Sequence, residues 1–165
     1  MTRSEILKKK CRKIKLLISD VDGILTDGGM YYSEKGEVLK KFNTRDGMGI
    51  ELLSKKGVKT ILMTKENSNI VKSRAKKIKA AATYLGICTK EKHLTKICKK
   101  FSVNNEQIAY IGDDVNDLEI IKKVGFSAAP DDAIFQVRKK VDYVCKTKGG
   151  DGVLREVADF ILRYQ

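Results

Sequence analysis

Short apolar runs alternate with amphipathic stretches along the chain, and this alternation predicts an α/β fold. Apolar runs bounded by turn residues are typical of buried strands. The intervening stretches carry apolar residues every three or four positions, the spacing of a helix that buries one face. Strands alternating with helices predict a mainly parallel, Rossmann-like sheet with helices on both faces. The runs expected to be strands are 16–18, 58–63, 81–85, 107–112, 126–129 and 143–145.

Helices are expected between these strands. A charged lead-in covers 4–13, and the stretch 43–47 leads into a helix that stops at Gly57. The glycine-rich stretch 149–152 is expected to be a flexible loop before a C-terminal amphipathic helix. The other expected helices cover residues 70–78, 91–101, 118–124 and 133–140.

One stretch interrupts the alternation and predicts a β-hairpin. Residues 30–32 and 37–42 are rich in strand formers, and the loop 33–36 between them contains a glycine. Between Asp22 and Thr64 there is room only for this hairpin and one helix, so no cap domain is expected. The plainest interpretation of the hairpin is an ordinary two-stranded excursion of the chain with no special role, although such a ribbon is only marginally stable by itself.

Composition narrows the class of protein. The 165 residues are 42% hydrophobic and 33% charged, which indicates one globular domain over 1–165. The formal charge is +13, but the lysines are scattered over nearly every expected helix. We therefore expect a solvated surface that attracts anionic substrates, with nucleic-acid binding as a remote alternative. The absence of a long apolar run or signal peptide, together with four separated cysteines, predicts a cytoplasmic protein with reduced thiols and no membrane partner.

Two aspartates follow the first apolar run. Asp20 and Asp22 are two residues apart, and on extended backbone such residues lie on the same side. Ligands of open α/β sheets bind at the carboxyl ends of the strands, so both carboxylates can face one small volume there. Close carboxylates are tolerated when a cation such as Mg²⁺ binds them or when their pKa values shift. The alternative interpretation is a strand ending in an ordinary Asp-Gly turn.

Further chemical groups follow other apolar runs, and together they match phosphoryl transfer. One carboxylate can attack phosphorus to form an aspartyl-phosphate, and a second can protonate the leaving alcohol and later activate water. A hydroxyl and backbone N–H groups can hold phosphate oxygens, while a lysine and Mg²⁺ offset the developing charge. Taken singly, each residue could be a cap or a solvated side chain. The groups are Asp20 and Asp22, then Thr64, then Lys90, then Asp113, Asp114 and Asp117.

The motif Asp20-Val21-Asp22-Gly23-Ile24-Leu25-Thr26 resembles the first motif of the haloacid dehalogenase-like phosphatases. Thr64, Lys90 and residues 112–117 match the later motifs in order, and the resemblance covers nearly the whole chain. It implies that Asp20 is the nucleophile and Asp22 the general acid/base. It also implies that Mg²⁺ is bound by the Asp20 carboxylate, by the Asp113 carboxylate and by the backbone carbonyl of Asp22. Lys90 would take part in catalysis, and Thr64 and Gly23 would bind the substrate. Asp114 and Asp117 would be supporting acids.

Because no cap domain fits, the chain resembles the capless sugar-acid phosphatases, the 3-deoxy-D-manno-octulosonate 8-phosphate phosphatase group. The hairpin and the stretches 42–47 and 149–157 all look like that group. Its members are typically homotetramers in which hairpins associate and a neighbouring subunit roofs each active site. The resemblance therefore implies a homotetramer whose hairpin serves oligomerisation and whose neighbour helps to exclude water from the site.

One departure bears on the substrate. The chain has Thr64-Lys65-Glu66 where octulosonate phosphatases usually have Thr-Gly-Arg. Glu66, with Arg74 and Lys77 on the next helix, is similar to the branch acting on 2-keto-3-deoxy-nononate and N-acylneuraminate 9-phosphates. That resemblance predicts a nine-carbon substrate of sialic acid biosynthesis, bound in part by Glu66, Arg74 and Lys77. The plainer interpretation is a solvated helix with a glutamate near its N-terminus, where the helix dipole favours it.

Two alternatives remain open. The nearer one is a 3-deoxy-D-manno-octulosonate 8-phosphate phosphatase of lipopolysaccharide biosynthesis, which has the same chemistry and a shorter sugar. The other is a non-catalytic oligomerisation module of sialic acid activation. The retained side chains of Asp20, Asp22, Lys90 and Asp113 argue against the module, because a non-catalytic domain has no physical need for clustered carboxylates.

Overall fold

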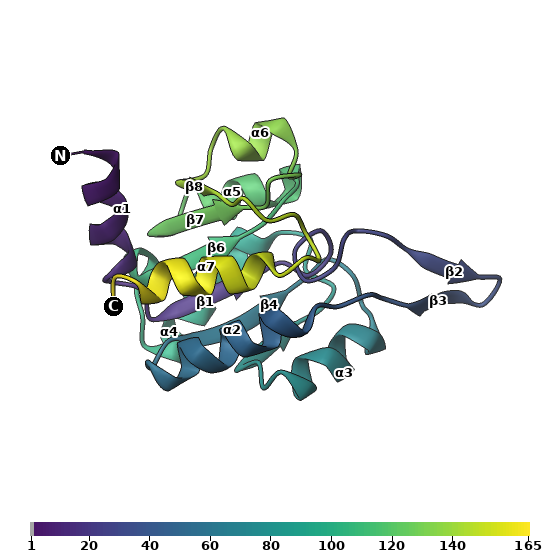
Figure 1. The fold of residues 1–165 in the computed structure, drawn as a ribbon. Coiled ribbons are helices and arrows are strands. Elements are labelled where there is room, and N and C mark those ends of the chain that lie inside the picture. Colours follow the sequence, from purple (N-terminus) through teal and green to yellow (C-terminus); the bar gives the residue numbers. More distant parts are fainter. Residues whose placement is uncertain (1) are drawn as a thin grey trace.

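In a computed structural model, which describes residues 2–165, a six-stranded sheet lies at the centre of the molecule (Figure 1). Every pairing in this sheet is parallel. The central strand β1 is buried at all four positions, so the loop that follows it emerges at the middle of the sheet's carboxyl edge. From edge to edge the strands are β5 (Ala82–Tyr84), β4 (Lys59–Met63), β1 (Leu16–Ser19), β6 (Ile108–Ile111), β7 (Phe126–Ala129) and β8 (Tyr143–Val144).

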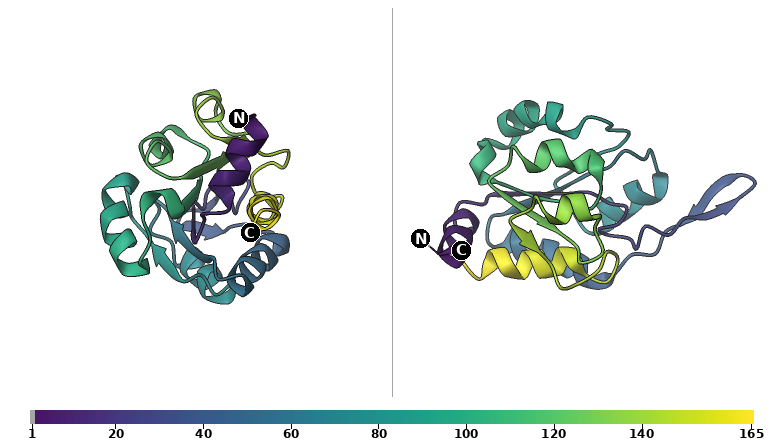
Figure 2. Two further views of the ribbon diagram at one scale, coloured as in Figure 1. Left: turned by 90° about the vertical axis from the view of Figure 1, so that its left-hand side faces the viewer. Right: turned by 90° about the horizontal axis from the view of Figure 1, so that it is seen from above.

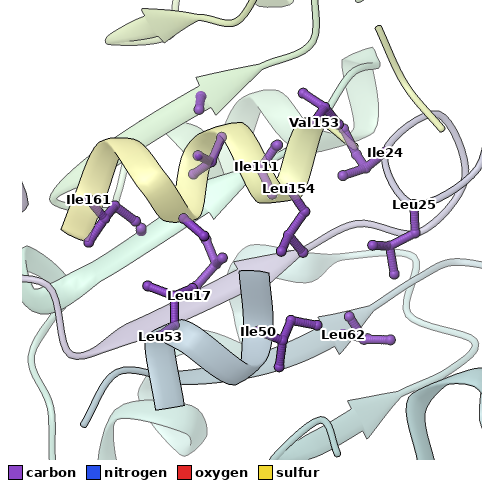
Figure 3. Packing of buried hydrophobic residues seen from close by; sticks show 14 of the residues in the cluster. Leu17, Ile24, Leu25, Ile50, Leu53, Leu62, Ile111, Val153, Leu154 and Ile161 are labelled. Carbon is purple, nitrogen blue, oxygen red and sulfur yellow. The ribbon is translucent and has the colours of Figure 1, made fainter. Parts of the chain in front are cut away.

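Helices cover both faces of the sheet, as the alternating pattern predicts (Figure 2). Alternate residues of β1 enter different cores: Leu17 packs with the first group of helices, and Leu16 and Ile18 with the second. Figure 3 shows the first core, in which side chains of β1, α2 and α7 meet. No helix within residues 2–165 is long and apolar enough to cross a membrane. The first group is α1 (Arg3–Cys11), α2 (Thr44–Lys55), α3 (Asn69–Lys77) and α7 (Val153–Leu162), and the second is α4 (Leu94–Phe101), α5 (Leu118–Ile121) and α6 (Phe135–Arg138).

Several helices differ in extent from the sequence-based expectation. The helix α2 begins at Thr44, because Asn43 caps it by accepting a hydrogen bond from the Arg45 N–H at 3.0 Å. The segment expected to be one helix over 91–101 is divided into a 3₁₀ turn, η1 (Lys90–His93), and α4. The helices α5 and α6 have only four residues each. Both short helices still contribute buried residues to the second core, namely Ile120, Ile121 and Val137.

The predicted hairpin is present and projects from the side of the molecule opposite both termini (Figures 1 and 2). Its strands are β2 (Tyr31–Ser33) and β3 (Gly36–Leu39), paired antiparallel. In the described chain only this hairpin and α2 lie between β1 and β4, so no cap domain is inserted there. Five large apolar side chains on or beside the hairpin are 46% to 61% exposed: Met30, Tyr31, Tyr32, Val38 and Leu39.

The glycine-rich loop before α7, predicted to be flexible, is packed against the loop that follows β1. Gly149 and Gly150 are both buried. The Gly150 N–H donates to the Ile24 carbonyl at 2.9 Å, and a Cβ atom on Gly149 would lie 2.0 Å from the Gly23 carbonyl oxygen. Glycine is therefore required at 149 so that the two backbones can touch. This contact braces the segment that carries Asp22.

Candidate active site

The polar residues predicted at the strand ends gather at the carboxyl edge of the sheet. A hollow of about 270 Å³ opens there. Asp20 and Asp22 reach it from the loop after β1, and Thr64 reaches it from the end of β4. Asp113 and the exposed Asp114 reach it from the end of β6. Three neighbouring parallel strands thus end at the same volume, so the polar side chains that follow them meet there.

The centre of the site is a buried lysine between two carboxylates. Lys90 comes from η1 and is 0% exposed. Its ammonium lies 2.5 Å from Asp20 Oδ2 and 2.6 Å from Asp117 Oδ1, and it donates to the Tyr110 hydroxyl at 3.0 Å. Burial would lower the pKa of Lys90, but the charges of Asp20 and Asp117 raise it above its ordinary value. Lys90 therefore stays charged and fixes one oxygen of Asp20.

Asp117 supports this arrangement with both of its oxygens. Its Oδ1 accepts from Lys90 and from the Tyr110 hydroxyl, the latter at 2.6 Å. Its Oδ2 accepts from the backbone N–H of Asp113 at 2.9 Å. A Cβ atom on Gly112 would lie 2.3 Å from that oxygen, so the chain needs glycine there. Asp117 holds the loop after β6 in place and has little remaining capacity for a further ligand.

Three carboxylates of the site lie close enough together to surround a divalent cation. Single oxygens of Asp20, Asp113 and Asp117 lie within 4.8 Å of one another. Burial, reinforced by Asp117 and opposed by Lys90, raises the pKa of Asp20 to about 7. Burial together with the charges of Asp20, Asp117 and Asp114 raises the pKa of Asp113 to about 8. This excess of negative charge is what a hard, oxygen-binding cation offsets, and Asp20 and Asp113 are the carboxylates best placed to bind it.

Asp22 has different surroundings. Its Oδ1 accepts from the ammonium of Lys40 at 2.6 Å and lies 3.5 Å from the Thr26 hydroxyl. Its Oδ2 is buried and finds no hydrogen-bond partner within residues 2–165. An acid/base residue needs one oxygen free to take or give a proton. Oδ2 of Asp22 carries no hydrogen bond from the described residues, whereas the oxygens of Asp20 are held by Lys90 and by the Val21 N–H.

The loop after β4 supplies a hydroxyl and two charged groups. Thr64 is buried, and its Oγ1 accepts the Glu66 N–H at 3.1 Å. Glu66 lines the hollow as the sequence predicted, with its side chain exposed. Lys65 and Asn116 line it too and were not anticipated. The sequence did offer one indication that they belong to the site, because Lys65 follows Thr64 and Asn116 precedes Asp117.

Arg74 and Lys77 lie elsewhere. In the part of the chain that the structure describes, they line a separate hollow between α2 and α3. Arg74 donates to the Asn43 carbonyl at 2.7 Å, and its guanidinium lies 5.4 Å from the centre of the Phe42 ring. The face of α3 that carries Arg74 therefore packs against the start of α2. The structure does not bring this basic pair to the active-site hollow of its own subunit, contrary to the sequence-based expectation.

Sequence reasoning also missed Lys40 and Tyr110. Both contact predicted site residues: Lys40 contacts Asp22, and Tyr110 contacts Lys90 and Asp117. Lys40 was one lysine among many in a basic chain. Tyr110 sits within an apolar strand, where an aromatic residue is read as core. Neither has a local pattern that separates it from its neighbours.

These groups define a class of protein: a hydrolase with a Rossmann-like α/β sheet, equipped for phosphoryl transfer. The site holds a carboxylate fixed by a buried ammonium and a second carboxylate that lines the same hollow. Acids arranged to hold a divalent cation and a buried threonine hydroxyl complete it. Each of these groups has an established part in phosphoryl-group chemistry.

Comparison with known proteins agrees with this class. A family model described as haloacid dehalogenase-like hydrolase matches residues 63–157. The chain is 38% identical over 159 residues to 3-deoxy-D-manno-octulosonate 8-phosphate phosphatase from Haemophilus influenzae, a match that covers 96% of this chain and 88% of the relative. The structure of the Yersinia pestis phosphatase of the same name superposes with a TM-score of 0.94 at 36% identity, covering 98% of this chain and 87% of that one. A Moraxella catarrhalis phosphatase of that name, in complex with magnesium ion, phosphate ion and a KDO molecule, gives a TM-score of 0.92 at 34% identity and covers 96% and 91% of the two chains.

The chain therefore belongs to the haloacid dehalogenase-like hydrolases, in the capless group of phosphatases similar to 3-deoxy-D-manno-octulosonate 8-phosphate phosphatase. This confirms the fold class, the family and the phosphatase activity expected from the motifs. The individual roles of the site residues stay predictions.

The acidic cluster makes a prediction about metal binding that does not depend on turnover. Mg²⁺ is expected to raise the melting temperature of the wild-type protein, because a ligand present at 100 times its Kd stabilises the folded state by about 2.7 kcal/mol. Asp113→Asn removes one charge from the cluster without breaking a side-chain hydrogen bond recorded within residues 2–165. We expect this variant to be at least as stable as wild type without metal and to gain little from Mg²⁺ in thermal unfolding.

The exposed Asp151 offers a matched control. Asp151→Asn makes the same chemical change outside the hollow and should keep the full Mg²⁺ response. A full response in Asp113→Asn would place the cation elsewhere.

Proposed function

We propose that this protein hydrolyses the phosphomonoester of an eight-carbon sugar acid, 3-deoxy-D-manno-octulosonate 8-phosphate. The observation that carries the proposal is 36% to 38% identity to phosphatases of that name over 94% to 96% of the chain. The complex of the Moraxella catarrhalis relative with magnesium, phosphate and KDO supports the same substrate and cofactor. The proposed substrate belongs to lipopolysaccharide rather than sialic acid biosynthesis. A cytoplasmic location stays a prediction from the sequence.

In the proposed mechanism Asp20 attacks phosphorus and forms an aspartyl-phosphate. Asp22 gives a proton to the leaving sugar oxygen and then takes one from the attacking water. Lys90 keeps Asp20 oriented and offsets its charge, while Thr64 and the backbone near Gly23 hold phosphate oxygens. Asp20, Asp113 and the backbone carbonyl of Asp22 would hold Mg²⁺, which supplies positive charge against the developing charge of the phosphoryl group.

A nine-carbon sugar acid 9-phosphate is the second candidate. It is favoured by Glu66, which lines the hollow where octulosonate phosphatases usually have arginine. The location of Arg74 and Lys77 away from that hollow removes the carboxylate-binding pair that the nine-carbon interpretation requires within one subunit. The eight-carbon substrate is therefore the better-supported proposal. The non-catalytic module is disfavoured, because an assembly role does not explain a buried Lys90 held by two carboxylates.

Paired substrates separate the two candidates. Phosphate release from the eight-carbon and nine-carbon substrates, with and without Mg²⁺, is expected to give the higher kcat/KM for the eight-carbon ester and little activity without metal. Asp20→Asn serves as the inactive control, and its kcat is expected to be lower than that of wild type by at least about a thousandfold. If Glu66 contacts the sugar, Glu66→Ala should change kcat/KM for both sugar acids by about ten- to a hundredfold, the range of a lost charge-assisted contact.

Lys77→Ala, with its exposed neighbour Lys76→Ala as control, should leave both substrates unchanged. A higher kcat/KM for the nine-carbon ester, lost selectively in Lys77→Ala, would reverse the assignment. An active Asp20→Asn variant would rule out the aspartyl-phosphate.

We also propose that the protein is a homotetramer joined through its hairpins. The hairpin carries Met30, Tyr31, Tyr32, Val38 and Leu39, all about half exposed. Such a concentration of exposed apolar side chains is typical of an interaction site. Met30 also lines the active-site hollow, so a neighbouring hairpin seated there could help to exclude water.

Light scattering at micromolar concentration is expected to give the mass of a tetramer. Tyr32→Asp places a charge in the proposed interface and should yield smaller species. Phe135→Asp is the matched control, because Phe135 is 65% exposed, like Tyr32 at 61%, but lies on α6 away from the hairpin. A fully active monomer would refute both the assembly and the shared exclusion of water.

A further inference from the structure

Lys40 is a buried lysine at the base of the hairpin, and the mechanism above leaves it without a role. Its side chain is 0% exposed, whereas that of the next residue, Lys41, is 58% exposed. The Lys40 ammonium lies 2.6 Å from Asp22 Oδ1 and 2.6 Å from Glu37 Oε1. A buried charge is tolerated when it is paired, and the two carboxylates pair with it. The chain thus holds the buried Lys40 ammonium against Asp22, the carboxylate proposed to transfer the proton.

Glu37 connects this cation to a second part of the site. Its Oε2 accepts a hydrogen bond of 2.7 Å from the hydroxyl of Ser68, the N-cap residue of α3. The Ser68 side chain makes no capping bond to its own helix, so its hydroxyl is committed to Glu37. A continuous series of contacts therefore runs from Asp22 through Lys40 and Glu37 to the segment that follows Thr64.

These contacts give the two oxygens of Asp22 different surroundings. Oδ1 is held by Lys40 and lies near the Thr26 hydroxyl. Oδ2 has no partner among residues 2–165. A carboxylate fixed through one oxygen keeps the other at a defined position, which proton transfer within hydrogen-bond reach requires.

Lys40 is poorly placed to bind substrate itself. Its ammonium is engaged by two carboxylates, and its side chain is closed to solvent. The phosphate site already has a buried cation, Lys90. The loss of Lys40 is therefore expected to affect kcat rather than KM.

We infer that Lys40 is the positioning residue of Asp22, fixing the orientation of its carboxyl group for proton transfer. The inference rests on the proposed function. In the first step a bond forms between Asp20 and phosphorus, the bond from phosphorus to the sugar oxygen breaks, and the Asp22 carboxyl group gives its proton to that oxygen. In the second step water attacks phosphorus, its proton passes to the Asp22 carboxylate, and the bond to Asp20 breaks to release phosphate.

Two substrates that differ in their need for a proton test this role. The sugar-acid phosphate must leave as an alcohol, whereas p-nitrophenyl phosphate leaves as a stable phenolate without protonation. In rapid-quench measurements with Mg²⁺, Lys40→Met is expected to slow the first turnover of the sugar phosphate by about ten- to a hundredfold. This is less than the roughly 10²- to 10⁴-fold that a complete general acid contributes. KM should stay at its wild-type value.

The same variant should release the first equivalent of nitrophenolate at the wild-type rate. Later turnovers of p-nitrophenyl phosphate should be slow, because hydrolysis of the aspartyl-phosphate still needs Asp22 as a base. The expected signature is a burst of nitrophenolate followed by a slow steady state. Lys41→Met, the neighbouring exposed lysine, is the matched control and should behave like wild type on both substrates.

An equal loss of first-turnover rate on both substrates would overturn the inference. Lys40 would then be needed for folding or for phosphate binding rather than for proton transfer. Wild-type behaviour of Lys40→Met would overturn it as well. A wild-type protein that releases phosphate from neither substrate would count against the proposed function instead.

A second variant covers the case in which Lys40→Met does not fold, since removing one member of a buried ion pair leaves an unpaired charge. Lys40→Met combined with Glu37→Gln removes one charge of each sign and still releases Asp22 Oδ1. It should show the same difference between substrates, and an equal loss on both would again overturn the role. Ethylammonium added to Lys40→Ala should restore the sugar-phosphate rate selectively, and a general recovery of both rates would contradict it.

Discussion

The centre of the site depends on the buried Lys90 ammonium, which lies between Asp20 and Asp117. Moving an ammonium out of water costs several kcal/mol unless good partners compensate it. Two carboxylates and the Tyr110 hydroxyl do so here. Because these partners come from the loop after β1, from β6 and from η3 (Val115–Asp117), the cation ties the central segments of the carboxyl edge together. The same ion pairs that stabilise the lysine therefore orient the Asp20 carboxylate.

This dense arrangement of charge requires backbones and side chains to approach closely, and glycines permit it. A Cβ atom on Gly23 would lie 2.0 Å from Asp113 Oδ2, and one on Gly112 would lie 2.3 Å from Asp117 Oδ2. Gly149 lets the loop before α7 press on the same segment. A side chain at any of these three positions would displace a carboxylate or a loop of the site.

The sequence predicted the parts of the structure that follow from local pattern. The six strands appear at the predicted apolar runs, and Asp20, Asp22, Thr64 and Asp113 meet because parallel strands share one edge. Pattern could not show that Lys40 is buried while Lys41 is exposed, since both are lysines after a strand. That difference arises from tertiary contacts with Asp22 and Glu37.

Arg74 and Lys77 illustrate the opposite error. Their spacing correctly placed them on a helix with a common face, but spacing carries no information about which neighbour that face meets. The face packs toward the start of α2, where Arg74 bonds the Asn43 carbonyl. Residues that follow a site loop in sequence can therefore point away from it once the helix is docked.

We expect Asp20 to become phosphorylated during turnover, and borohydride trapping tests this most directly. Borohydride reduces an acyl phosphate, so enzyme quenched during turnover of its sugar-acid phosphate should contain homoserine at position 20 in peptide mass spectra. The amount should grow with substrate and vanish without Mg²⁺. Turnover that leaves Asp20 unreduced, or that places the reduction at Asp22 or Asp113, would contradict the account.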